Sequence, residues 1–331
     1  MSVSKKDINS YRFDRTLAQR FVNDMNLPIQ VIDEETFKYW IALYENDYQS
    51  ETLWNELWEE IDEDYNGDAS KFLDAYYEVR DNVIKTVTES EAFKKFNESD
   101  FGWCKIQTPL NPKHKELYNA ENVGKRFLSF DLVKSNIQAL NYADKDILMN
   151  SLAYEDFIGK FTDSRYIAKS KYFRQVVFGQ MNPKRHITIA KYLISKVYDL
   201  LRANGLKYDL VCVSSDEIVF EIPENTGTEV GRVIGEAVPL IQKELGLIVR
   251  GTEFRLQGYN LRTDGCKSVC NFYLKWGGNV GWELKGVPLQ YYSVVYKMMK
   301  GKEVGLYDKV FQYERCKCLF DENFSVEKFG Q

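Results

Sequence analysis

Two short apolar runs joined by four polar residues constrain the fold of this chain more than any other feature. The first run is YDLVCV (208–213), the second is IVFEI (218–222), and SSDE (214–217) joins them. Two β-rich runs on either side of a short polar segment predict an antiparallel hairpin. Asp216 and Glu217 would then lie together at its tip.

An earlier apolar run carries an aspartate near its end. RFLSFDLV (126–133) is typical of a buried strand, and Asp131 lies two residues before its last residue. Helical stretches are expected at roughly 143–160 and 183–203, before the hairpin, and a helix at 227–246 after it. The remaining expected segments are strands within 247–261, 269–278 and 280–288, and a helix at 290–301. The order strand, helices, hairpin, helix, strand predicts an α+β fold, with helices covering one face of an antiparallel sheet.

The N-terminal third is acidic and has helical periodicity. Residues 33–47, 50–65 and 69–96 each carry apolar side chains at three- and four-residue spacing. We expect these segments to form a helical bundle with its aromatic side chains packed inward. A module that recruits another protein is the alternative.

Charge and cysteine content exclude some classes of protein. The net charge of −5 argues against a protein that coats duplex nucleic acid over a wide surface, although a local basic cleft remains compatible with it. No run approaches the roughly 18 apolar residues of a membrane span, and no signal peptide is recognisable, so a cytoplasmic protein without a membrane partner is expected. Cys266, Cys270, Cys316 and Cys318 could form a four-thiolate zinc site, but their spacing is not the usual one, so free thiols are expected and zinc binding is the alternative.

The carboxylates are suited to phosphoryl transfer. Two-metal catalysis needs carboxylates that converge on ions about 3.5–4 Å apart, and neighbouring strands of a sheet lie less than about 5 Å apart. Asp131 and the pair Asp216 and Glu217 each lie between β-rich apolar segments. Each has a plain alternative: Asp131 as a helix N-cap, and residues 214–217 as a polar turn.

The sequence around these acids resembles polymerase palms. FLSFDLVKSNIQAL (127–140) is similar to motif A, in which a strand delivers an aspartate and turns into a helix. VCVSSDEIVFEI (211–222) is similar to motif C, a hairpin with acidic residues at its tip. The setting also resembles the tRNA-His guanylyltransferases and the diguanylate-type nucleotide cyclases. The resemblance covers about residues 125–290.

This resemblance implies roles for individual residues. Asp131 and Asp216 would be metal ligands, the backbone carbonyl of Leu132 would bind one ion, and Glu217 would be a supporting ligand. The implied cofactor is Mg²⁺ or Mn²⁺. The implied partners are a nucleoside triphosphate and a DNA or RNA end.

Two departures leave the exact reaction open. Leu132 stands where the guanylyltransferases have glycine, and the separation of about 85 residues between Asp131 and Asp216 is closer to that in reverse transcriptases and replicative polymerases. A polymerase-like nucleotidyltransferase is therefore the first expectation. A nucleotide cyclase and an inactive palm that binds nucleic acid or a partner are the alternatives. The composition and the unmatched N-terminal region also suggest a protein encoded by a phage or mobile element.

The resemblance divides the chain into four parts. A helical acidic domain (1–105) and a linker (106–124) precede a palm-like catalytic domain (125–300) and a C-terminal extension (301–331).

A basic segment lies between the two acidic sites. Residues 168–186 hold several cations and no acid, which in an acidic protein is typical of a phosphate-binding region. A solvated basic face is the alternative. The WELKGVP segment (282–288) resembles a strand-turn that contacts substrate phosphates in some polymerases, and a glycine-proline turn with an exposed lysine is the alternative. The phosphate-binding candidates are Lys171, Arg174, Lys184, Arg185 and Lys285.

Overall fold

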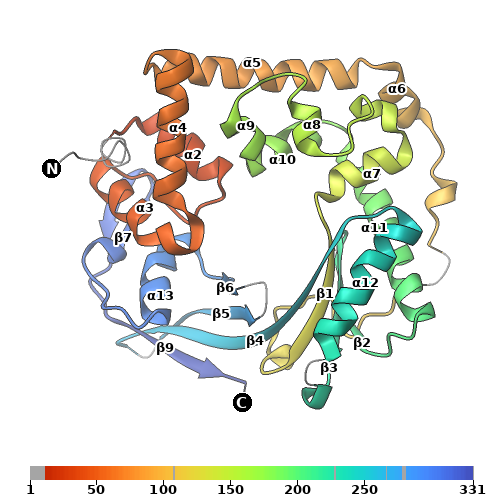
Figure 1. The fold of residues 1–331 in the computed structure, drawn as a ribbon. Helices are drawn as coiled ribbons and strands as arrows, with labels where there is room; N and C mark the ends of the chain where they lie inside the picture. The colour runs from red at the N-terminus through yellow and green to blue at the C-terminus, as the bar shows by residue number, and fades with distance from the viewer. Residues whose placement is uncertain (1–11, 107–108, 227–228, 266, 278–280, 331) are drawn as a thin grey trace.

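A computed structural model (Figure 1) describes residues 12–106, 109–226, 229–265, 267–277 and 281–330. The strands of its main sheet are β1 (Arg126–Leu132), β2 (Asp209–Val213), β3 (Glu217–Ile222), β4 (Val249–Thr263), β5 (Ser268–Gly277), β6 (Gly281–Lys285) and β9 (Phe324–Phe329). They pair antiparallel in the order β2-β3-β1-β4-β5-β6, with β9 beside β4. The expected α+β class with an antiparallel sheet is therefore confirmed.

Helices make up most of the rest of the described chain. The longer ones are α2 (Arg15–Asp24), α3 (Glu34–Tyr48), α4 (Ser50–Tyr65), α5 (Ala69–Thr88), α6 (Glu91–Glu98), α7 (Ser135–Ala143), α10 (Lys171–Gly179), α11 (Pro183–Ala203), α12 (Glu229–Leu245) and α13 (Tyr292–Met299). Shorter α-helical or 3₁₀ turns are η1 (Gly102–Cys104), η2 (Ala120–Asn122), η3 (Lys145–Leu148), α8 (Tyr154–Ile158), α9 (Arg165–Lys169), η4 (Glu224–Thr226), η6 (Leu289–Tyr291) and η7 (Tyr307–Lys309). A separate hairpin consists of β7 (Val310–Tyr313) and β8 (Cys316–Leu319).

The connections of the first four strands place the hairpin beside β1. The chain runs from β1 through helices to the β2–β3 hairpin, then through α12 to β4, and the strands lie in the order β2-β3-β1-β4. This is the split β-α-β arrangement of ferredoxin-like folds. Because β3 runs antiparallel to β1, the start of β3 lies beside the end of β1. The hairpin tip and Asp131 are thereby brought to one end of the sheet.

Side-chain alternation along β1 assigns its residues to two faces. Leu128, Phe130 and Leu132 belong to the large core formed with the helices, and Phe127 belongs to a smaller cluster on the other face. Successive side chains of a strand point to opposite faces, so Asp131 lies on the same face as Phe127. Figure 1 shows α11 and α12 along the helix-covered face.

One helix expected from the sequence is misplaced. Instead of a helix at 143–160, α7 begins directly after β1 and ends at Ala143, and η3 and α8 follow as short separate turns. Asp144 is extended and its side chain caps η3. Met149 and Asn150 then have positive φ angles of 51° and 59°. Asp144 ends α7, and the left-handed residues separate η3 from α8.

The N-terminal helices share one hydrophobic core with the rest of the chain. α3, α4, α5 and α6 occupy the segments in which helices were expected, and the buried cluster they belong to extends from Leu17 to Val310. In Figure 1, α5 crosses above the sheet from α4 to α6, while α3 lies beside α13 and β7. Of the expected N-terminal domain, the described residues 12–105 are therefore packed into the molecule over a wide surface.

The expected linker and extension also contact the sheet. The backbone N–H groups of Lys113 and His114 donate to carbonyls of Leu210 and Val211 in β2. Residues 301–331 contribute β9, which pairs with the second half of β4. Both segments thus contribute backbone hydrogen bonds to the main sheet.

None of the described helices has the length and apolar character needed to cross a membrane. Of the candidate zinc ligands, Cys270 lies in β5 and Cys316 and Cys318 lie in β8. Their thiols are free. Cys266 lies outside the described residues.

Candidate active site

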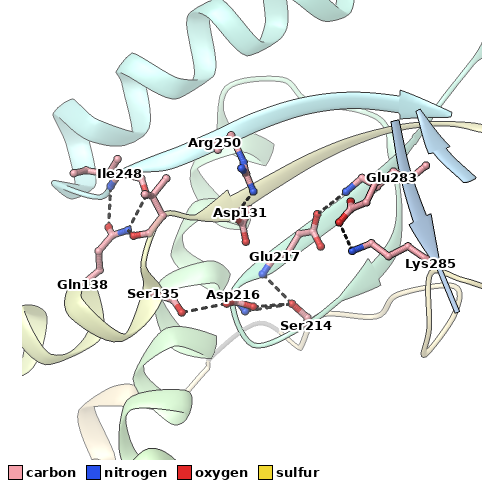
Figure 2. Close-up of polar contacts among 12 residues, drawn as sticks. Asp131, Ser135, Gln138, Ser214, Asp216, Glu217, Ile248, Arg250, Glu283 and Lys285 are labelled. Carbon is pink, nitrogen blue, oxygen red and sulfur yellow. Dashed lines mark hydrogen bonds and ion pairs between the residues drawn. The ribbon is translucent and has the colours of Figure 1, made fainter. Parts of the chain in front are cut away.

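Strand pairing brings the predicted carboxylates together. Asp131 and Glu217 are direct partners across β1 and β3, and residues directly opposite in an antiparallel pair have Cβ atoms about 4.5–5.5 Å apart. The backbone N–H of Leu132 donates to the carbonyl of Asp216 at 2.8 Å. Figure 2 shows Asp131, Asp216 and Glu217 at this end of the sheet.

Each carboxylate has a different partner. Asp131 accepts from the guanidinium of Arg250 at 3.2 Å, and Arg250 is its neighbour on β4. A carboxylate oxygen of Glu217 lies 3.9 Å from the ammonium of Lys275.

Asp216 has hydroxyl partners instead of cations. It accepts from Ser135 Oγ at the start of α7 and from Ser214 Oγ, both at 3.1 Å. Two of the three acids are therefore paired with basic side chains and the third with hydroxyls.

The surroundings of Asp131 disfavour the charged form of its carboxyl group. Burial, together with the negative charges of Glu217 and Asp216, raises the pKa of Asp131 to about 6, even though Arg250 and Lys275 act in the opposite direction. Its side chain is 29% exposed. A further cation beside this carboxylate would stabilise its charged form.

The acids open onto a polar cavity of about 650 Å³. Lys171 and Arg174 line it from α10, where their three-residue spacing puts them on one face of the helix. Lys285 lines it from β6, and Leu132 from the end of β1. Among the described residues that line it, six are basic and four are acidic, so the cavity is locally positive in a chain whose net charge is −5.

Two predicted phosphate-binding residues lie elsewhere. The guanidinium of Arg185 donates to the carbonyls of Phe96 and Ser99 at 2.6 and 2.9 Å and stacks on Phe101. It holds α11 against the end of α6. Lys184 is exposed at the start of α11, and neither residue is among those that line the cavity.

Several residues of the cavity were not anticipated from the sequence. Arg250, Lys275, Glu283 and Tyr118 line it alongside the predicted acids. Glu283 accepts from Lys285 at 2.5 Å, and burial raises the pKa of Tyr118. Arg250 and Lys275 lie at the cavity because of the strand register of β4 and β5. Apolar periodicity in the sequence does not specify that register.

The donor set has the chemistry that Mg²⁺ prefers, but the donors do not converge. Carboxylate and carbonyl oxygens are the usual protein ligands of Mg²⁺. Among the described residues, no group of three or more His, Cys, Asp or Glu side chains is placed to hold a metal ion. Asp131 and Glu217 are each directed to a basic side chain. These two acids would have to leave their basic partners before they could share an ion.

In comparisons with protein families, curated proteins and solved structures, nothing matches the chain.

Proposed function

We propose that the chain is a metal-dependent nucleotidyltransferase of polymerase-palm type, which adds nucleotides from a nucleoside triphosphate to a nucleic-acid end. One observation carries this proposal. One positively charged cavity is lined both by the acids Asp131, Asp216 and Glu217 and by Lys171 and Arg174. The acids and these basic residues are far apart in the sequence. Hard oxygen donors beside phosphate-binding cations are what two-metal phosphoryl transfer requires.

Each group has a role in this reaction. Lys171, Arg174 and Lys285 would bind the triphosphate, since charge-assisted contacts to phosphate are roughly twice as strong as neutral ones. Asp131, Asp216 and the carbonyl of Leu132 would hold Mg²⁺, with Glu217 in support. When bound, the ions would activate the attacking hydroxyl and neutralise charge on the phosphoryl group.

The reaction is a substitution at phosphorus. The acceptor hydroxyl oxygen bonds to the α-phosphorus as the bond to the bridging oxygen breaks. Pyrophosphate leaves, and the hydroxyl proton passes to water.

Arg250 and Lys275 act as counter-ions for the carboxylates in the metal-free protein. Arg250 is well exposed, with 69% of its side chain accessible, so it can turn away from Asp131 at little steric cost. Both cations line the cavity and would be free to contact the phosphates once metal neutralises the acids. The ion pairs of the metal-free site are then replaced by metal and triphosphate together.

The test is a labelled-nucleotide incorporation assay. The full chain is incubated with labelled NTPs or dNTPs and Mg²⁺ or Mn²⁺, with and without DNA or RNA, and products are sized. Asp216→Asn should abolish extension. The matched control is Asp209→Asn, on the same hairpin but outside the cavity and paired with Lys113, which should extend as wild type does.

Other outcomes of the same assay identify the alternatives. A cyclic nucleotide formed without nucleic acid would indicate a cyclase. Nucleic-acid binding without any product, in either metal, would indicate an inactive palm.

A further inference from the structure

A groove lined by aromatic side chains lies apart from the carboxylate cavity. It has a volume of about 440 Å³, and Phe96, Phe101, Trp103 and Tyr142 line it. Trp103 is 44% exposed and Tyr142 is 45% exposed. Their ring centroids are 5.8 Å apart, and both rings also contact Tyr192 on α11. A cluster of large exposed aromatic rings on a protein surface is typical of a binding site for a ligand or a macromolecule.

Helix α11 separates this groove from the carboxylate cavity. Successive residues of an α-helix are about 100° apart around its axis. Tyr192 lies on the aromatic side, and Ile187 and Ala190 line the carboxylate cavity. Lys184 and Lys191 lie at angles between them, and both are exposed. The exposed stripe of α11 is therefore a continuous path from the aromatic groove to the carboxylates.

The charges along this path favour a polyanion. Within the described chain, neither Lys184 nor Lys191 has an acidic side chain at ion-pair distance. Among the described residues that line the aromatic groove, Asp144 is the single acid, and it accepts a hydrogen bond from the backbone N–H of Asp146. Unpaired lysines on an acidic protein attract phosphates, and neighbouring aromatic faces accept stacked bases.

We infer that the groove and the exposed stripe of α11 bind single-stranded nucleic acid. Bases stack on Trp103 and Tyr142, and phosphates contact Lys184 and Lys191. Binding of the strand needs only these residues. The bound strand presents its end to the carboxylate cavity, which rests on the proposed function. It also gives Lys184 a phosphate contact outside the triphosphate site.

Fluorescence anisotropy of the full chain with labelled oligonucleotides of about 16 nucleotides tests this inference. Oligo(dT) and oligo(U) are titrated in parallel, because comparing their affinities distinguishes DNA binding from RNA binding. Trp103→Ala should weaken binding on the order of tenfold, since stacking on one aromatic side chain contributes about that much. Lys184→Ala/Lys191→Ala should reduce the slope of log Kd against log salt by about 1.4, or about 0.7 for each phosphate that the protein no longer neutralises.

Matched variants elsewhere on the surface are the controls. Tyr313→Ala removes a ring that is 62% exposed on β7, and Lys85→Ala/Lys302→Ala removes two exposed lysines. Neither should change binding. Circular-dichroism melts verify that all variants are folded. Wild-type affinity in Trp103→Ala, or no oligonucleotide binding by the wild-type chain, would overturn the inference.

Failure of this inference and failure of the proposed function look different. If oligonucleotide binding depends on Trp103 but no nucleotide is ever transferred, the strand site stands and the transferase proposal fails. If transfer occurs and Trp103→Ala binds and extends oligonucleotides like wild type, only the strand site fails.

Discussion

Asp131 destabilises the metal-free protein at neutral pH. Its pKa is raised to about 6 in the folded state, above the value of about 3.9 in an unfolded chain. The folded state therefore holds this proton to higher pH than the unfolded state does. It follows that stability is lost as pH rises from about 4 to about 6 and stays lower above that range.

We expect Asp131→Asn to stabilise the metal-free protein. The gain should be small near pH 4 and reach about 1–3 kcal/mol above pH 6, because each pKa unit corresponds to about 1.4 kcal/mol. Urea unfolding of both proteins in EDTA at pH 4.5 and 7.5 measures it. Asp209→Asn is the control, since Lys113 lowers the pKa of Asp209. An Asp131→Asn variant that is less stable than wild type at pH 7.5 would contradict the assignment.

Arg174 offers a direct test of the triphosphate site. Arg174→Ala should weaken triphosphate binding in the presence of Mg²⁺, by an amount that shrinks at high salt because screening acts within about 10 Å at 0.1 M. Titration calorimetry with a non-hydrolysable triphosphate measures the change.

The control for Arg174 comes from the same basic segment. Lys169 pairs with Glu56 at 2.9 Å and does not line the cavity, so Lys169→Ala should bind triphosphate as wild type does. Equal affinities of the two variants would show that the basic segment is a solvated face.

At the scale of elements, α10 is held in place by the N-terminal helices. Asp24 of α2 is fully buried and accepts hydrogen bonds from Tyr76 of α5 at 2.8 Å and Tyr166 of α9 at 2.9 Å. Arg20 stacks on Tyr172 of α10. α9 leads directly into α10, so this network fixes the helix that carries Lys171 and Arg174.

Tyr166→Phe should therefore move the triphosphate site as well as lower stability. Losing a hydrogen bond to a charged group costs about 1.5–3 kcal/mol of unfolding free energy, and a displaced α10 should raise the KM for triphosphate more than it lowers kcat. Urea unfolding and steady-state kinetics measure the two effects.

Tyr296→Phe is the control for Tyr166→Phe, because it removes the same kind of hydrogen bond at a different place in the molecule. This buried tyrosine also donates to an aspartate, Asp47, at 2.5 Å, and it lies on α13. It should lose similar stability and keep a wild-type KM. An unchanged KM in Tyr166→Phe would show that the network is structural only.

The elements differ in how well the sequence specified them. The hairpin, β1 and α11 were predicted nearly to the residue, because apolar runs or a helical apolar pattern extend over almost their whole length. The segment 143–160 was not, since its short turns are set by Asp144 capping and by left-handed Met149 and Asn150. Local chemistry overrides a weak helical period there.

The candidate site was predictable only in part. Its acids lie at the end of β1 and in the tip of the β2–β3 hairpin, and the local sequence indicates both positions. The strand register places Arg250 and Lys275 at the cavity. Arg185 lies outside the cavity because it contacts α6. The positions of all three residues depend on tertiary packing, which the local sequence does not specify.

The larger of the two buried cores runs from the N-terminal helices through the rest of the described chain, which predicts how a truncated chain behaves. Removing residues 1–105 would expose the buried side chains of α9 and α10 that pack against α2, α4 and α5, and those of α13 that pack against α3. We expect the remaining chain to lose cooperative unfolding and to aggregate, because exposed apolar surface of this extent is not tolerated. Differential scanning calorimetry and gel filtration test it. A monomeric fragment with a sharp transition would show that the palm-like region folds independently.

The contacts between the two ends of the chain bear on the order in which it folds. Gln312 donates its backbone N–H to Gln30 across 282 residues, and Tyr44 packs on Tyr292 and Tyr296. During synthesis, the partners of these side chains emerge from the ribosome long after the side chains themselves. The aromatic surface of α3 therefore stays uncovered until α13 has been made. Folding that depends on such distant contacts is slow, and its intermediates are prone to aggregation.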